Sequence, residues 1–318
     1  MSEQNASGGA RSCAFKTKVG GQALIEGIMM RGPQKTCMAV RQPDGTLYTE
    51  EMENPKKHFG RIPIVRGFFG FIESMIVGYK TLMRSADLSM TEEQAAAEQT
   101  AFDRWVDKHF GEKGANLMLG LAAVLGVCLA VGLFMVLPTF LVGLLGRVLP
   151  LGGFKTLLEG LLKIAILVGY MAAVSRLPDI HRMFRYHGAE HKTISCYEAG
   201  LPLTVENVRG CRRFHPRCGT SFILIVLIVS VLVYSLLPWS GTGLRVVLKL
   251  LLLPVVMGIS YELLQWCGRS DSLVARWASA PGLWLQHITT AEPDDGMIEC
   301  AIAAVTPVLP EKPEEALW

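Results

Sequence analysis

Two parts of the chain, residues 114–175 and 219–263, are almost continuously apolar, whereas polar and charged residues fill the rest. The first apolar run contains 33 residues without a formal charge, between Lys113 and Arg147. A helix of that length would measure about 50 Å, against about 30 Å for the hydrocarbon core of a bilayer. Pro138 offers a break, so we expect one membrane span near 115–137, followed by a kinked or re-entrant tail.

A second span is expected at 154–175. Lys155, Glu159 and Lys163 stand four residues apart there, so they share one helical face and can pair. The rest of the segment is apolar.

Two further apolar runs predict spans three and four. Gly219–Leu244 has 26 residues without a charge, and the run at roughly 245–266 carries Lys249 near one end and Glu262 near the other. The fold class indicated is a mostly α integral membrane protein with about four transmembrane helices.

The polar N-terminal region predicts a small β-containing unit. Thr36 to Arg41 is strand-like, residues 42–45 (Gln-Pro-Asp-Gly) have turn chemistry, and Thr46 to Thr49 form the returning strand. From Pro63 to Met90, apolar residues recur at helical spacing with charges between them. This pattern indicates an amphipathic helix that lies on the bilayer or on other helices.

These patterns divide the chain into seven segments: a flexible tail (1–16), a β-containing cytoplasmic unit (17–60), the amphipathic helix and an acidic linker (61–112), spans one and two (113–175), a cytoplasmic His/Cys loop (176–218), spans three and four (219–266) and a cytoplasmic C-terminal segment (267–318).

Positive charge is concentrated between spans two and three. Residues 176–218 hold eight Lys/Arg against four acids, whereas the connections at 146–155 and 239–249 hold two Lys/Arg each. The positive-inside bias places 176–218, and with four spans both termini, in the cytoplasm. We therefore expect a multi-pass protein of the cell (inner) membrane, with the lipid bilayer as a partner and no nucleic-acid partner. The eight scattered cysteines are expected to be reduced thiols.

The chemistry-bearing motif is His187-Gly188-Ala189-Glu190-His191, an H-x-x-E-H sequence. On a helix, His187 and His191 project from one face, one turn apart. Two imidazoles at this spacing can bind zinc or another divalent metal, with Glu190 as the base that takes a proton from a metal-bound water. Alternatively, the two histidines are interfacial residues that contact lipid headgroups.

A third ligand is not fixed by the motif. Glu262 is one candidate, because a carboxylate that ends an apolar stretch is costly unless it has a function; a salt bridge to an arginine is the alternative. His215 and Cys218, in an H-x-x-C arrangement, are others. With His187 and His191 they would form a closed, structural four-ligand site.

Five segments resemble the YqhQ-like family of bacterial membrane proteins of unknown function: 20–33, 187–192, 215–222, 259–262 and 281–286. The likeness spans residue 17 to about 304. Members are in places described as predicted metal-dependent enzymes. The resemblance implies metal chemistry at His187, Glu190 and His191, with His215 and Cys218 as companions.

The sequence thus predicts a membrane-bound, zinc-dependent hydrolase that acts on a peptide or lipid-linked substrate. The alternative is a non-enzymatic membrane assembly or translocation accessory protein whose His/Cys cluster is structural. A transporter is less favoured, because few ionisable groups lie in mid-membrane.

Overall fold

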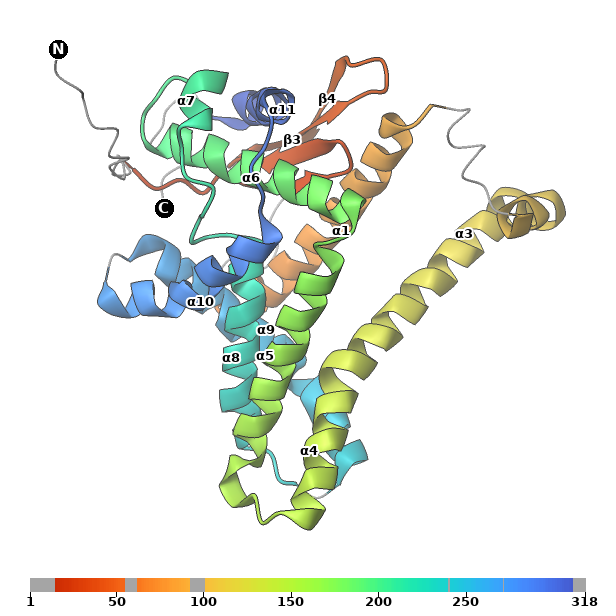
Figure 1. Ribbon diagram of the computed structural model, residues 1–318, viewed down its shortest axis with the longest axis vertical. Coiled ribbons are helices and arrows are strands. Elements are labelled where there is room, and N and C mark those ends of the chain that lie inside the picture. Colours follow the sequence, from red (N-terminus) through yellow and green to blue (C-terminus); the bar gives the residue numbers. More distant parts are fainter. Residues whose placement is uncertain (1–14, 55–61, 92–100, 240, 271, 311–318) are drawn as a thin grey trace.

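The computed structural model describes residues 15–54, 62–91, 101–239, 241–270 and 272–310 (Figure 1). A four-stranded sheet with its covering helices lies at one end of the molecule, and a column of apolar helices extends from it. The strands are β1 (Gly20–Leu24), β2 (Gly27–Arg31), β3 (Lys35–Arg41) and β4 (Leu47–Glu53). The helices are α1 (Val65–Ser89), α3 (Ala101–Val131), α4 (Leu137–Val148), α5 (Lys155–Val174), α6 (Pro178–Glu198), α7 (Val205–Arg209), α8 (Gly219–Ser235), α9 (Thr242–Arg269), α10 (Leu273–Thr289) and α11 (Asp295–Val305).

The sheet is an antiparallel meander in the order β1-β2-β3-β4. The β3–β4 hairpin confirms the predicted turn, in which the Gln42 N–H donates to the Thr46 carbonyl and Gly45 has a φ of 86°. The β1–β2 hairpin, which the sequence did not predict in detail, turns through Ile25 and Glu26. The predicted β-containing unit is therefore a complete sheet of its own.

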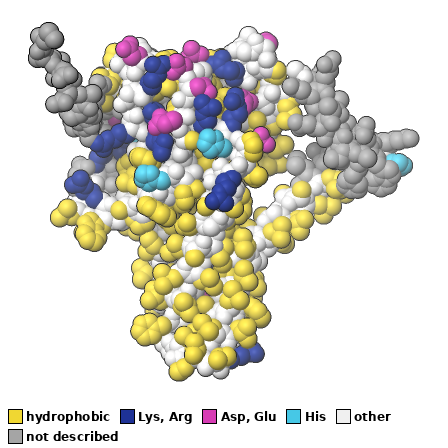
Figure 2. Space-filling view, in the orientation of Figure 1, with side chains coloured by type: hydrophobic (Ala, Val, Ile, Leu, Met, Phe, Trp, Pro, Cys, Tyr) yellow, Lys and Arg dark blue, Asp and Glu magenta, His cyan; other side chains and the backbone are white. Residues whose placement is uncertain are grey.

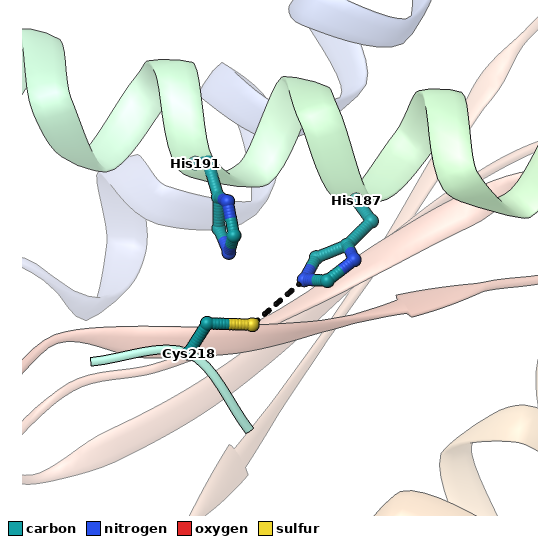
Figure 3. A group of neighbouring side chains, drawn as sticks. All are labelled: His187, His191 and Cys218. Carbon is teal, nitrogen blue, oxygen red and sulfur yellow. Dashed lines mark hydrogen bonds between the residues drawn. The ribbon is translucent and has the colours of Figure 1, made fainter. Parts of the chain in front are cut away.

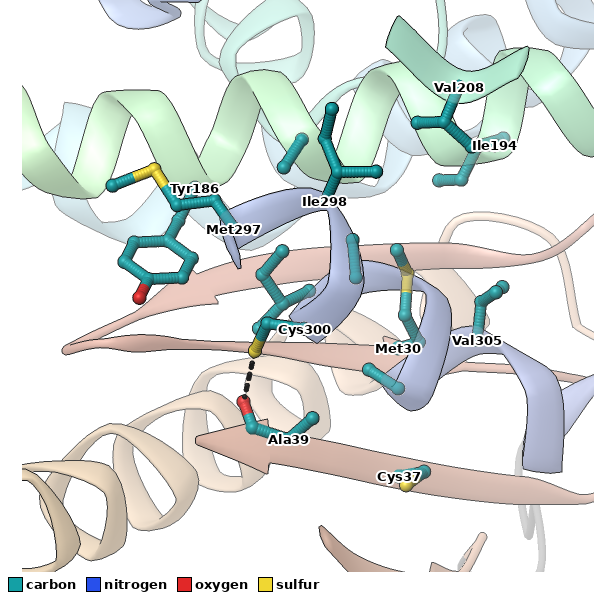
Figure 4. Packing of buried hydrophobic residues seen from close by; sticks show 14 of the residues in the cluster. Met30, Cys37, Ala39, Tyr186, Ile194, Val208, Met297, Ile298, Cys300 and Val305 are labelled. Carbon is teal, nitrogen blue, oxygen red and sulfur yellow. Dashed lines mark hydrogen bonds between the residues drawn. The ribbon is translucent and has the colours of Figure 1, made fainter. Parts of the chain in front are cut away.

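Side chains alternate between the two faces of the sheet along each strand, and β2 and β3 are buried on both faces. Ile28, Met30, Cys37 and Ala39 face α6 and α11, where they pack with residues such as Ile298 (Figure 4). On the other face, Leu24, Met29 and Met38 pack against Val77, Leu82 and Leu88 of α1. The sheet thereby holds α6, which carries the H-x-x-E-H motif, against a rigid support.

The amphipathic helix predicted between Pro63 and Met90 is confirmed as α1, which packs against the sheet and α9. Of the predicted acidic linker, residues 92–100 lie outside the described residues, and residues 101–104 already belong to α3. The predicted loop 176–218 is largely helical, since α6 and α7 occupy much of it.

The first apolar run differs from the prediction. Pro138 does not break the helix: α3 continues through a π-helical turn at Gly132–Val136 into α4, giving an apolar helix over Gly120–Val148. The Leu137 N–H donates to the Gly132 carbonyl, five residues back. This wider turn directly precedes the proline, which lacks an N–H and crowds the preceding turn.

The third apolar run is also shorter than predicted. α8 ends at Ser235, after 17 residues, and α9 begins at Thr242. Pro238 and Gly241, whose φ is 148°, lie in the connection and disfavour a continuous helix. In the described residues, three helices are long and apolar enough to cross a membrane: Gly120–Val148, Gly152–Val174 and Thr242–Arg269. α8 is a shorter apolar helix that packs between α5, α9 and α10.

Glu159 is the centre of a buried ion-pair cluster in the column, which Lys155 does not join because it lies over the Trp239 ring. Glu159 of α5 accepts from Lys249 of α9, and its carboxylate lies 2.9 Å from the Lys163 ammonium. The predicted shared face of Glu159 and Lys163 is therefore real, and the pair is buried within the bundle.

Candidate metal centre

Helix α6 places His187 and His191 one turn apart on the same face. Pro178 occupies the first turn of the helix and Asp179 follows it, which favours helix initiation there. The two imidazole rings lie 4.4 Å apart, centroid to centroid. The predicted i, i+4 geometry of the motif is thus present.

Cys218 provides the third converging side chain. It is the N-cap residue of α8, and its sulfur accepts from the Thr220 N–H at 3.4 Å. Each of His187, His191 and Cys218 has one donor atom within 4.8 Å of the others (Figure 3). The His187 Nε2 atom lies 3.1 Å from the Cys218 sulfur.

Backbone carbonyls orient both rings. The Nδ1 atom of His187 lies 2.8 Å from the Thr289 carbonyl oxygen, and that of His191 lies 2.6 Å from the Arg213 carbonyl oxygen. A carbonyl can only accept, so each Nδ1 carries the proton and each Nε2 is presented toward the cysteine. Metal-binding histidines are typically held in this way.

The His191 Nε2 atom is buried and has no hydrogen-bond partner among the described residues. A buried polar atom without a partner costs about 1–3 kcal/mol. A cation between this nitrogen, the His187 Nε2 and the Cys218 sulfur would satisfy it. Two imidazoles and a thiolate form a donor set that suits a zinc-type ion and leaves one tetrahedral position open.

The electrostatics of the three side chains favour a deprotonated sulfur. Burial opposes ionisation of Cys218, but the positive charge of His187 and His191 outweighs it and holds the pKa of Cys218 well below its usual value. Burial likewise opposes protonation of His187, yet the neighbouring sulfur raises the pKa of His187 to about 10. A metal binds the thiolate and the unprotonated form of Nε2, so a cation at this site would displace the proton that the His187 Nε2 atom holds beside the sulfur.

Glu190 precedes His191 on α6, is not one of the three converging side chains, and is only 5% exposed. Burial raises the pKa of Glu190 despite the opposing charge of both imidazoles, and the Gly21 N–H donates to its carboxylate. The Oε2 atom has no partner in the part of the chain that the structure describes. A Cβ atom on Gly21 would lie 2.5 Å from the Met29 carbonyl oxygen and 3.1 Å from the Glu190 carboxyl carbon, so this strand position requires glycine.

His215 is near the group but is engaged elsewhere. Its ring lies 5.7 Å from that of His191, and its Nε2 atom is 3.4 Å from Glu198, which also binds Arg217. The His215 N–H donates to the side-chain oxygen of Gln286 at 2.8 Å, and the side-chain nitrogen of Gln286 donates to the His215 carbonyl at 2.7 Å.

Glu262 is not brought to the group. Both of its carboxylate oxygens accept from the guanidinium of Arg66 on α1, one of them at 2.6 Å. Of the five residues predicted as metal ligands, the structure therefore gathers His187, His191 and Cys218, while His215 lies within hydrogen-bonding distance of Glu198 and Glu262 forms an ion pair with Arg66.

Sequence reasoning missed the residues that orient the centre, because they act through their backbones. Thr289 and Arg213 contribute only carbonyl groups to it. Gly188 is a third such residue: a Cβ atom there would lie 2.0 Å from the Ala291 carbonyl oxygen. The glycine inside the H-x-x-E-H motif is the one signal that could have indicated close packing of another segment on α6.

Comparison with known proteins agrees with the resemblance. Residues 62–311 match the family described as "Protein of unknown function (DUF1385)". The chain is also 37% identical over 300 residues to "Uncharacterized protein YqhQ" of Bacillus subtilis (strain 168), covering 91% of this chain and 92% of that protein. The chain belongs to this family. No solved structure matches it. All three members of the His/His/Cys group lie within the region that the family shares.

Proposed function

We propose that the protein is a membrane-bound, zinc-dependent hydrolase of the cell (inner) membrane, with its metal centre in the cytoplasm. His187, His191 and Cys218 would hold the ion. The observation that carries this proposal is the buried, unpartnered Nε2 atom of His191, which shares a space with two further donor atoms.

The chain's own residues account for the rest of the chemistry. A zinc-type ion, when bound, lowers the pKa of a water molecule to about 7. Glu190 would accept the proton that this water loses and then donate it to the leaving group of the substrate. Burial raises the pKa of Glu190, which makes its carboxylate a stronger base than an exposed one. The Gly21 N–H holds the carboxylate in place.

Metal content of the purified full-length protein tests the ligand set. We expect about one ion per chain in the wild type, a loss in His191→Ala and Cys218→Ala, and retention in Glu190→Gln. His181→Ala is the matched control, because His181 is an exposed histidine on the same helix. Equal, sub-stoichiometric metal in the wild type and in His191→Ala would show that no such centre exists.

An open coordination position separates a hydrolase from a structural site. In the cobalt-substituted protein, azide should change the visible absorption spectrum if one position is free. Proton release from casein or from a bacterial lipid extract should then depend on the metal, and should fall about 10²–10⁴-fold in Glu190→Gln. A spectrum that azide leaves unchanged would favour the alternative, an accessory protein with a closed structural site.

A further inference from the structure

A pocket with a volume of about 440 Å³ lies directly beside the candidate metal centre. Arg213 and Thr290 are among the residues that line it. The backbone carbonyl of Arg213 orients His191, and that of Thr289, one residue before Thr290, orients His187. The wall of the pocket is therefore built from the same segments that hold the two imidazoles.

The pocket carries an excess of positive charge. Its ionisable lining residues are Arg176, Arg213, His181, His287 and a single acid, Glu292. The Glu292 carboxylate is already shared by Lys192 at 2.6 Å and Arg213 at 3.3 Å. Within the described ranges Arg176 forms no ion pair, so its guanidinium charge is not neutralised by the protein itself.

Arg213 is held in place with one donor unused. Its guanidinium lies 5.0 Å from the centre of the Phe214 ring, and that ring lies 4.5 Å from the ring of His287. The Nε atom of Arg213 is buried and has no hydrogen-bond partner among the described residues. A guanidinium held in this way is suited to a phosphate, which offers several acceptor oxygens to its terminal N–H groups.

Helix α10 indicates the depth of the pocket relative to a membrane. It runs across the end of the apolar column, beneath the sheet and α6 (Figure 1). Trp277 and Trp284 are 78% and 57% exposed on it, and Leu273 and Val274 are exposed as well. Exposed tryptophans on an amphipathic helix are typical of the headgroup level of a bilayer.

The C-terminal part of α10 supplies His287 and Ile288 to the pocket. Lys, Arg and His side chains gather on this side of the molecule just above the apolar column (Figure 2). With α10 at headgroup level, the pocket that its C-terminal part lines would lie near the phosphates of lipids.

We propose that this pocket binds the phosphate of a membrane lipid headgroup, so that the substrate class is a phosphate-bearing lipid or lipid-linked molecule. The substrate assignment rests on the proposed function, because it takes the neighbouring metal centre as the reacting group. Binding of the phosphate itself does not depend on the metal.

Binding to the full-length protein in neutral detergent tests the proposal, with short-chain phosphatidic acid as the probe. Arg176→Gln and His287→Gln should each raise its Kd by about tenfold, the effect of losing one hydrogen bond to the phosphate. Arg212→Gln is the matched control, since Arg212 is an exposed arginine beside Arg213 that does not line the pocket. Thermal unfolding of the same samples shows that the variants are folded.

Three further probes make the result decisive. Diacylglycerol, which lacks the phosphate, should bind much more weakly, and so should inorganic phosphate, which lacks the acyl chains. Equal binding of either one, competition by an acidic peptide, or unchanged affinity in both pocket variants would overturn the proposal. A wild type that binds the lipid through Arg176 and His287 but contains no metal would refute the proposed hydrolase and leave the pocket assignment standing.

Discussion

At the level of single residues, the centre depends on backbone carbonyls as much as on its three donor side chains. The carbonyls of Thr289 and Arg213 fix the proton of each imidazole on Nδ1, which leaves both Nε2 atoms facing Cys218. Orientation of this kind cannot be recognised in a sequence, because every residue type has a carbonyl group.

The cysteines differ in a way that alkylation can measure. Burial raises the pKa of Cys37 to about 11 and that of Cys300 to about 12, so at pH 7 they hold little of the reactive thiolate. The pKa of Cys218, in contrast, is held well below its usual value. We expect a chelator to increase alkylation of Cys218 in the folded protein and to leave Cys37 and Cys300 unlabelled, as followed by peptide mass spectrometry. Labelling of Cys218 that is the same with and without chelator would argue against a bound metal.

Glu262 shows the limit of reasoning from single residues. A carboxylate at the end of an apolar helix indicates that a partner exists, but not which one. The structure supplies Arg66 from α1, some 200 positions earlier, and this corresponds to the salt-bridge alternative. Cys218 takes the place beside the two histidines that the sequence left open.

At the level of elements, the approach of the 289–293 segment to α6 is what positions His187. Gly188 allows this approach, since any Cβ atom there would overlap the Ala291 carbonyl group. The Ala291 N–H also donates to the Phe184 carbonyl at 2.9 Å, which ties the segment to the same helix.

Gly188→Ala should therefore weaken both the fold and the metal site. Overpacking costs about 1–3 kcal/mol, and the displaced segment would carry the Thr289 carbonyl away from His187. Thermal unfolding together with metal analysis measures the two effects. Gly169→Ala is the matched control, because a Cβ atom on this α5 glycine meets nothing within 4 Å. Full metal content in Gly188→Ala would show that this packing does not control the centre.

Element boundaries were predicted well where the pattern is local and less well in the apolar runs. The β3–β4 hairpin and α1 follow from turn residues and helical periodicity. In a continuous apolar run there is no periodicity to mark an end. The continuation through Pro138 and the early end of α8 at Ser235 were therefore decided by packing and local backbone geometry.

At the level of the whole molecule, the sheet end and the far end of the column differ in charge. The basic segment 176–218 lies at the sheet end, and the connections after α4 and α8 lie at the opposite end (Figure 1). If the column spans a bilayer, the positive-inside bias predicts that the sheet end, and with it the candidate metal centre, faces the cytoplasm.

Cysteine labelling of bacterial cells tests this orientation. Gly153→Cys, in the exposed connection between α4 and α5, should react with a membrane-impermeant maleimide in cells whose inner membrane is intact. Arg212→Cys, at the sheet end, should react only after that membrane is permeabilised. Both signals are read against the parent chain, which accounts for the native cysteines. Labelling of Arg212→Cys in intact cells would reverse the orientation.

The sequence by itself determined the features that depend on near neighbours: the strands and their turn, the helical character of the apolar runs, and two histidines on one helical face. These follow from backbone geometry over a few residues. Only the tertiary structure decided that Cys218 completes the group, that Glu262 does not, and that a basic pocket adjoins it. The spacing of His187 and His191 is set by the helix that carries both. Cys218 lies 31 residues from His187, and it reaches the two histidines only because α6 packs against the N-terminus of α8 and the 289–291 segment.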